Sequence, residues 1–184
     1  MLLIVLILVA LLLTTGILVF NRFIRYRALM REAWSGMDVQ LKRRHDLIPN
    51  IVEAVKGYMQ HERRLLEEIT NIRAKVIGLA TVKEKGEAEN SLSRTLKSIF
   101  AVAEAYPDLK ANQSFLELQN SLTETEDQIQ LARRYYNGTV RNNNILVESF
   151  PGNLVAQVFN FKPADFFEIE YATERQAPEV KLGS

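Results

Sequence analysis

An uninterrupted apolar stretch at the start of this 184-residue sequence constrains its fold more than any other feature. Residues 1–20 contain no charged side chain, and only two threonines and one glycine interrupt the run from Leu2 to Phe20. A helix rises about 1.5 Å per residue, so this run reaches about 28 Å, close to the hydrocarbon thickness of a bilayer. The sequence therefore predicts a transmembrane anchor over residues 1–21.

A cleaved signal peptide is the alternative interpretation of such a run. It would have a basic start, a shorter apolar stretch and a small-x-small cleavage site. Here the apolar run begins directly after Met1 and leads into Val19-Phe20-Asn21-Arg22, which lacks that pattern. We expect an uncleaved single-pass anchor.

The charges that follow the anchor predict its orientation. Four arginines come directly after the apolar run: Arg22, Arg25, Arg27 and Arg31. Arginine beside a bilayer resists translocation, so we expect the N-terminus outside and the rest of the chain in the cytoplasm. Binding of anionic lipid headgroups by these arginines is a further hypothesis. Without them the chain has 19 basic and 22 acidic residues, a net charge of −3, which disfavours a nucleic-acid partner.

The remaining sequence predicts an all-α fold, because its 8 glycines and 5 prolines fall mostly at boundaries of apolar 3.6-residue periodicity. The anchor is expected to continue as one helix until Pro49 kinks or breaks it. A second helical face then runs from Ile48 to Leu79, and a charged loop is expected over residues 83–90. A short helix from Ser91 is halted by Pro107.

A fourth, long helix is expected from near Asp108 to Pro151-Gly152. Apolar residues recur in it about every seven positions, which is typical of a bundle helix: Leu109, Phe115, Leu122, Ile129, Tyr136, Val140 and Val147. Asn153 is expected to cap a short helix that ends at Phe159. Trp34 is expected in the core. Together these elements predict a four-helix bundle over residues 22–160 and an acidic tail over residues 161–184, with a short helix in that tail.

Polar side chains interrupt the apolar spacing of the long helix. We call these four residues the polar seam: Gln119, Glu126, Arg133 and Asn143. Buried polar groups persist when they are paired and can fix the register of a bundle. The first interpretation is therefore that the polar seam has a structural role, with Arg73 as a plausible partner. A polar pocket for a small ligand is the alternative.

No residue pattern in the chain indicates catalysis. The sequence has no cysteine and two histidines, and neither His45 nor His61 stands in a Glu-x-x-His pair of the kind that holds a di-iron centre. There is no nucleophile elbow, phosphate-binding glycine loop or His-Glu-x-x-His motif. We predict no enzyme activity, no metal and no cofactor.

Several longer strings resemble the LemA family of bacterial membrane proteins. The strings are Ala33-Trp34-Ser35, Asp38 to Asn50, Val55-Lys56-Gly57-Tyr58 with His61-Glu62, Ala103 to Asn112, Arg133 to Asn137, Ser149 to Asn153, and Ala177-Pro178-Glu179-Val180. They cover almost the whole chain in order. The resemblance implies one N-terminal span in the bacterial inner membrane, a cytoplasmic antiparallel helical bundle and no established enzymatic activity, and a magnetosome-associated relative points to membrane organisation.

Three functions remain open at this level. The first is a non-enzymatic membrane-anchored scaffold that self-associates as a homo-oligomer. The second is an adaptor for another membrane protein, such as a protease or a transporter. The third is a sensor of lipid or a small ligand that uses the polar seam.

Overall fold

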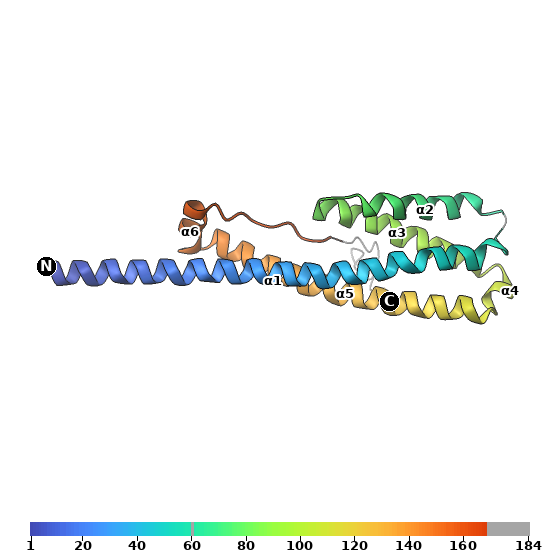
Figure 1. Cartoon of the computed structure of the whole chain (residues 1–184), viewed down its shortest axis with the longest axis horizontal. Coiled ribbons are helices and arrows are strands. Elements are labelled where there is room, and N and C mark those ends of the chain that lie inside the picture. Colours follow the sequence, from blue (N-terminus) through green and yellow to red (C-terminus); the bar gives the residue numbers. More distant parts are fainter. Residues whose placement is uncertain (60, 169–184) are drawn as a thin grey trace, which may run out of the picture. The chain divides into compact units, whose positions relative to one another are not determined.

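The computed structural model describes residues 1–59 and 61–168 (Figure 1). The described chain forms six helices and no β-strand: α1 (Leu2–Lys56), α2 (Arg63–Ile77), α3 (Val82–Ala103), α4 (Pro107–Lys110), α5 (Gln113–Glu148) and α6 (Gly152–Phe159). The predicted all-α fold, with a long apolar N-terminal helix that leads into a helical domain, is confirmed. The count of four bundle helices stays a prediction, since α4 and α6 have only 4 and 8 residues.

Helix α1 carries the chain without interruption from the apolar stretch to Lys56. The expected break at Pro49 is wrong, because Pro49 lies inside the helix. Its neighbours Ile48 and Ile51 are buried, and this packing outweighs the lost backbone hydrogen bond. The helix ends instead before Gly57. The apolar face predicted from Ile48 to Leu79 is therefore divided between α1 and α2.

Helix α3 begins where a charged loop was expected, so the loop over residues 83–90 is wrong. The Thr81 hydroxyl accepts a hydrogen bond from the Glu84 backbone N–H at 3.2 Å, and the Glu84 carboxylate accepts one from the Thr81 N–H at 3.4 Å. This reciprocal pair is a capping box, which satisfies backbone donors that a helix start leaves open. Most of the charged residues that suggested a loop lie in the first turns of a helix and are exposed or half-buried, whereas Glu89 is buried.

The long helix expected from Asp108 is two helices. Pro107 stands at the first position of α4, as expected, but the chain turns at Ala111 and Asn112 before α5 begins. The Asn112 side-chain oxygen accepts a hydrogen bond from the Phe115 N–H at 3.2 Å, which caps the new helix.

Helix α6 ends at Phe159, as predicted, but Asn153 does not cap it. Pro151 precedes the helix, and the Asn153 side chain accepts only from the adjacent Leu154 N–H. Residues 160–168 are not helical, so the short helix expected in the tail is absent from its described part. Three of the tail's acidic residues, Glu170, Glu174 and Glu179, lie outside the described residues.

The chain divides into two compact units, each with its own core. The first unit comprises residues 1–44 and 123–166, and its buried side chains include Phe23, Met37, Leu41, Ile129 and Val140. In it, the half-buried Trp34 packs edge-on against Tyr136 with ring centroids 5.3 Å apart.

Six of the seven apolar positions predicted on the long helix are buried, and Val147 is half-buried.

The second unit comprises residues 45–122 together with Phe167 and Glu168. Its core is mainly aliphatic and draws on α1, α2, α3, α4 and the start of α5, including Ile51, Val55, Ile69, Leu92 and Ile99. Helices α2 and α3 lie side by side within it (Figure 1).

Candidate functional site

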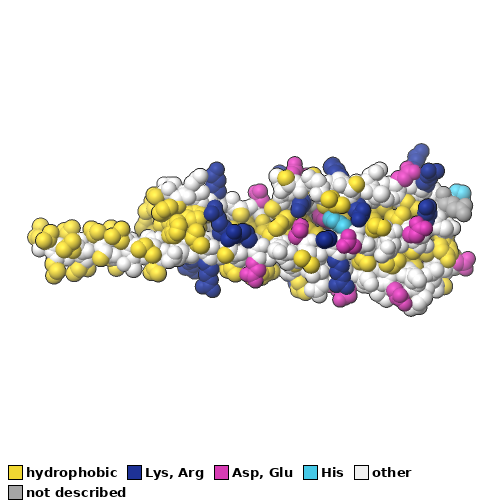
Figure 2. Space-filling view, in the orientation of Figure 1, with side chains coloured by type: hydrophobic (Ala, Val, Ile, Leu, Met, Phe, Trp, Pro, Cys, Tyr) yellow, Lys and Arg dark blue, Asp and Glu magenta, His cyan; other side chains and the backbone are white. Residues whose placement is uncertain are grey.

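The four arginines after the apolar run are all exposed on α1. The guanidinium carbon of Arg22 lies 5.9 Å from the centre of the Tyr26 ring, and that of Arg27 lies 5.5 Å from the centre of the Phe161 ring. Cations at such distances are attracted to aromatic faces. In the first unit the end of the apolar stretch therefore carries positive charge next to aromatic side chains, and Figure 2 shows dark blue side chains beside the apolar surface there.

Helix α6 packs against the apolar part of α1. The Phe20 ring centroid lies 4.8 Å from that of Phe159 and 5.7 Å from that of Phe161, and Phe23 stacks on Phe161 at 4.4 Å. An apolar groove of about 350 Å³ lies between α1, from Leu12 to Phe20, and α6. None of these contacts was predicted from the sequence. The signal that could have found them is the absence of charge between Glu148 and Lys162.

A glycine and an asparagine fix the position of α6 in the first unit. A Cβ on Gly152 would stand 2.0 Å from the Leu146 carbonyl oxygen, so only glycine allows α6 to approach the end of α5 this closely. Beyond α6, the Asn144 amide donates to the Ala164 carbonyl at 2.9 Å and accepts from the Ala164 N–H at 2.8 Å. The chain after α6 is thus fastened to α5.

The polar seam does not form one group. Gln119 belongs to the second unit, and Glu126, Arg133 and Asn143 belong to the first. Asn143 is buried and donates to the Asn144 side chain at 3.1 Å, whereas the other three residues of the seam are half-buried.

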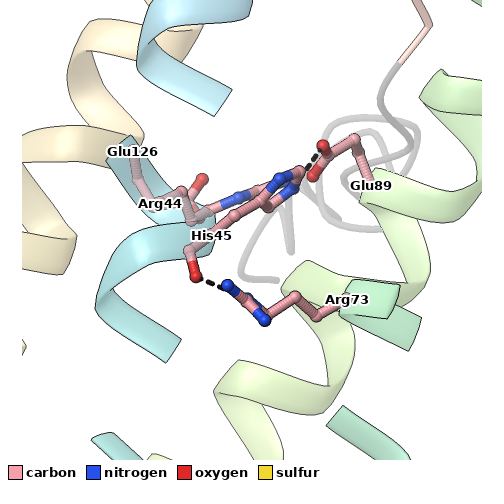
Figure 3. Close-up of polar contacts among 5 residues, drawn as sticks. All are labelled: Arg44, His45, Arg73, Glu89 and Glu126. Atoms are coloured by element: carbon pink, nitrogen blue, oxygen red, sulfur yellow. Dashed lines mark hydrogen bonds and ion pairs between the residues drawn. The ribbon is translucent and has the colours of Figure 1, made fainter. Parts of the chain in front are cut away.

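Glu126 is paired with Arg44 of α1. An Arg44 guanidinium nitrogen lies 2.7 Å from the Glu126 carboxylate, and the Arg44 side chain is 0% exposed. Arg44 was not predicted as a partner of the polar seam, although its place between Leu41 and Ile48 on the buried face of α1 was a usable signal. The expected partner Arg73 is wrong, because its Nε donates instead to the His45 carbonyl at 2.8 Å (Figure 3).

The second unit holds a buried histidine–glutamate pair. His45 Nε2 and a Glu89 carboxylate oxygen are 2.8 Å apart, and the Glu89 side chain is 1% exposed (Figure 3). Glu89 was missed because its segment was assigned to a loop. On α3 it stands one turn before Leu92 and on the same face, which is the pattern that identifies it.

Two tyrosine hydroxyls are held by acceptors. The Tyr106 hydroxyl donates to the Glu62 carboxylate at 2.9 Å, and this hydrogen bond, with some burial, raises the pKa of Tyr106. The Tyr136 hydroxyl donates to the Asp165 carbonyl at 3.1 Å. Burial raises the pKa of Tyr136, and the nearby Asp165 charge adds to the effect.

Neither histidine stands in a potential metal site in the part of the chain that the structure describes. His61 is exposed and His45 is engaged with Glu89. Across residues 1–59 and 61–168, no three or more His, Asp or Glu side chains gather in a way that could hold a metal ion.

Within the described residues, α1 is the one helix long and apolar enough to cross a membrane. Its apolar side chains are exposed, for example Leu3 at 71% and Leu12 at 71%, which is expected of a surface that faces lipid. The structure thus agrees with the predicted N-terminal transmembrane helix.

Comparison with known proteins identifies a matching protein family. The LemA family profile matches residues 33–182. Protein LemA of Metamycoplasma hominis is 28% identical over 163 residues, which cover 85% of this chain and 74% of that protein.

Magnetosome proteins are also similar. Magnetosome protein MamQ 2 of Paramagnetospirillum magneticum is 23% identical over 175 residues, and Magnetosome protein MamQ of Magnetospirillum gryphiswaldense is 20% identical over 180 residues. These matches cover 81% and 84% of this chain but only 64% and 66% of the two relatives. The apolar N-terminal helix and these relatives together indicate a membrane-associated protein, and the chain belongs to the LemA family.

Proposed function

We propose that the protein is a non-enzymatic, membrane-anchored scaffold that self-associates at the cytoplasmic face of the bacterial inner membrane. The observation that carries this proposal is the continuity of α1, which runs from the apolar stretch into the second unit without a break. Such a helix joins the anchor to the helical domain with no loop between them. Three relatives are named magnetosome proteins, and we extend to this chain only a part in a membrane-associated assembly.

An exposed face of α5 is the surface that we assign to self-association. Leu131 and Tyr135 lie one turn apart and are 54% and 52% exposed, and Ile145 further along the same face is 57% exposed. Gly138 lies between them, and among the described residues no atom comes within 4 Å of the place of its missing Cβ. Large apolar side chains around a glycine allow a second helix to pack closely. Anchoring in one plane favours such pairing because it concentrates the copies.

The oligomeric state of the full chain tests the scaffold. Purified protein is reconstituted in nanodiscs large enough for several copies, and its mass is measured across a range of concentrations. We expect oligomers that dissociate in Leu131→Lys/Tyr135→Lys, since two charges on the contact face oppose pairing. Leu116→Lys, an exposed position near the start of the same helix, is the matched control. A wild-type chain that stays monomeric at every concentration would refute the scaffold.

The orientation rests on the four arginines and needs its own experiment. The absence of native cysteine allows a single label site at Ile77→Cys, which is 65% exposed in the second unit. In intact spheroplasts we expect no reaction with a membrane-impermeant maleimide, and full reaction after lysis. Labelling of intact spheroplasts would place the helical domain outside the cytoplasm.

A groove in the second unit favours the adaptor as a second candidate. It has a volume of about 490 Å³ and lies between the end of α1 and α2, with apolar walls from Val52 and Leu66 and charged rims from Glu53, Arg63 and Glu67. A helix or loop of another membrane protein fits such a mixed surface. Crosslinking through Glu53→Cys in cells distinguishes the two functions, since a stoichiometric foreign protein supports the adaptor and a second copy supports the scaffold.

The ligand sensor has less support than the other two functions. Its key carboxylate, Glu126, is already engaged by Arg44 at 2.7 Å. Replacement of Glu126 and Arg133 therefore primarily tests stability. If replacement of Glu126 and Arg133 abolished ligand binding and left the melting temperature unchanged, the result would support the function of a ligand sensor.

A further inference from the structure

Helix α6 and its flanks form an uncharged segment on the outside of the first unit. Residues 149–161 contain no charged side chain, and the nearest charges are Glu148 and Lys162. The segment is also rich in exposed apolar side chains: Phe150 is 79% exposed, Leu154 52% and Val158 76%. Water-facing helices in soluble domains rarely combine these two properties. The segment thus needs a partner that is itself apolar.

The contacts of α6 with α1 fix its depth relative to the anchor. The Phe159 ring packs on Phe20, and the apolar groove between the two helices extends along α1 back to Leu12. Eight residues of helix correspond to about 12 Å, whereas one leaflet contributes about 15 Å of hydrocarbon. The first charged side chain of α1 is Arg22. A bilayer that covers the apolar stretch up to Phe20 therefore also covers the helix that lies beside it.

The polar residues of α6 recur on one strip of its surface. Asn153 and Gln157 are spaced at i and i+4, and the rest of the helix carries no polar side chain. This is the pattern of a helix that lies in a membrane interface, with one strip towards the headgroups. The cations that such a helix usually carries itself are supplied by α1, since Arg27 sits on the Phe161 ring at 5.5 Å.

We propose that α6 is a second membrane-binding element, which inserts into the same leaflet as the end of the apolar stretch of α1. Its ligand is the lipid bilayer: acyl chains contact Leu154 and Val158, and headgroup phosphates contact Arg22, Arg25 and Arg27. The inference rests on the apolar stretch being a membrane anchor, and it is independent of self-association. The chain is then held to the membrane at two points rather than one, which restricts rotation of the first unit about the axis of α1.

Depth-dependent fluorescence quenching in the full chain tests this inference. Single cysteines are introduced at Val158→Cys on the apolar side of α6, at Leu8→Cys in the anchor and at Val39→Cys, an exposed position of α1 well beyond the anchor. Each carries an environment-sensitive fluorophore in vesicles of phosphatidylcholine and phosphatidylglycerol. Quenching by spin-labelled lipids reports contact with acyl chains, and quenching by iodide reports contact with water.

We expect the label at position 158 to behave as the label at position 8 does. Both are quenched by spin-labelled lipids and resist iodide several-fold better than the label at position 39. If position 8 is quenched by lipid while position 158 is quenched by iodide alone, α6 lies in water and the inference is wrong. If position 158 resists both quenchers and crosslinks between copies, a second chain covers α6 and the inference is also wrong. If position 8 itself is not quenched by lipid, the anchor fails and the inference fails with it.

Discussion

Arg44 and His45 are adjacent in the sequence, yet they belong to different units and show two ways of burying charge. In the first unit the deeper member of the pair is the cation, since Arg44 is 0% exposed and Glu126 is 23% exposed. In the second unit the deeper member is the anion, since Glu89 is 1% exposed and His45 is 11% exposed. An arginine keeps its charge at any pH of interest, whereas histidine and glutamate can each become neutral.

The two units should therefore respond unequally to the loss of one partner of the buried pair. A buried arginine without its carboxylate has no way to discharge, so the full cost of burying it remains. A buried carboxyl without its histidine can take up a proton. The same contrast can be tested at other paired features of the two units, namely their glycines and their tyrosines.

The largest effect is expected for Glu126→Leu, which removes the carboxylate that lies 2.7 Å from Arg44. We expect the free energy of unfolding to fall by about 3 kcal/mol, because a fully buried cation loses its ion pair. Hydrogen exchange followed by mass spectrometry should show faster exchange in residues 123–148. The double variant Arg44→Met/Glu126→Leu is the control, and it should recover most of the loss. Equal stability of the single variant and the wild type would show that this pair contributes nothing.

The second prediction compares three glycines. Gly152→Ala places a Cβ 2.0 Å from a backbone oxygen in the first unit, and we expect a loss of about 2 kcal/mol with release of α6 from α5. Gly86→Ala in the second unit meets the Glu168 carbonyl at 3.0 Å and should cost less. Gly138→Ala meets nothing within 4 Å inside α5, and it should stabilise the chain by about 0.5 kcal/mol. Thermal unfolding followed by circular dichroism ranks the three, and any other order contradicts the prediction.

The third prediction concerns His45→Leu, which removes a partner of Glu89. We expect a cost of about 1 to 2 kcal/mol, smaller than that of Glu126→Leu, because a carboxyl can be buried in its neutral form whereas a guanidinium cannot. The double variant His45→Leu/Glu89→Leu removes both members of the pair, and as the control it should recover most of the loss. Unfolding in urea measures the three free energies. A His45→Leu variant that costs as much as Glu126→Leu would contradict the contrast between the pairs.

Much of the fold could be predicted because it depends on periodic burial, which the sequence records directly. The apolar stretch and the spacing of Phe115, Leu122 and Ile129 are of this kind. The structure has a long apolar helix over the first, and it buries all three of the latter side chains. The ends of helices were harder to predict from the sequence, because they depend on single side-chain contacts. The Thr81–Glu84 capping box turned an apparent loop into the start of α3, and packing around Ile48 and Ile51 carried α1 past Pro49.

The candidate site was predicted less well, for a physical reason. Glu126 was identified because it interrupts an apolar pattern on its own helix, but the choice of Arg73 as its partner required knowledge of which helices face each other. The same limit hid Glu89, and it hid the contact between Phe20 and Phe159, which are far apart in the sequence. Sequence spacing shows which residues share a face of one helix, and it does not show what that face meets.

The smallest effect is expected at alkaline pH, where the two units again differ in the origin of a shift. The pKa of Tyr136 is raised mainly by burial in the first unit, and that of Tyr106 mainly by the Glu62 carboxylate in the second. A hydroxyl whose pKa is higher in the folded state than in the unfolded chain stabilises the fold fully below the unfolded pKa of about 10, and this stabilisation is lost as the pH rises through the folded value.

The free energy of unfolding, measured in urea from about pH 9 upwards, should therefore fall less steeply in Tyr136→Phe and in Tyr106→Phe than in the wild type. Glu62→Ala should reproduce the flatter slope of Tyr106→Phe and leave the contribution of Tyr136 intact, because it removes the acceptor of the Tyr106 hydrogen bond together with the charge. If Glu62→Ala left the slope of the wild type unchanged, the carboxylate would not be the cause of the shift at Tyr106, and the second unit would resemble the first in relying on burial.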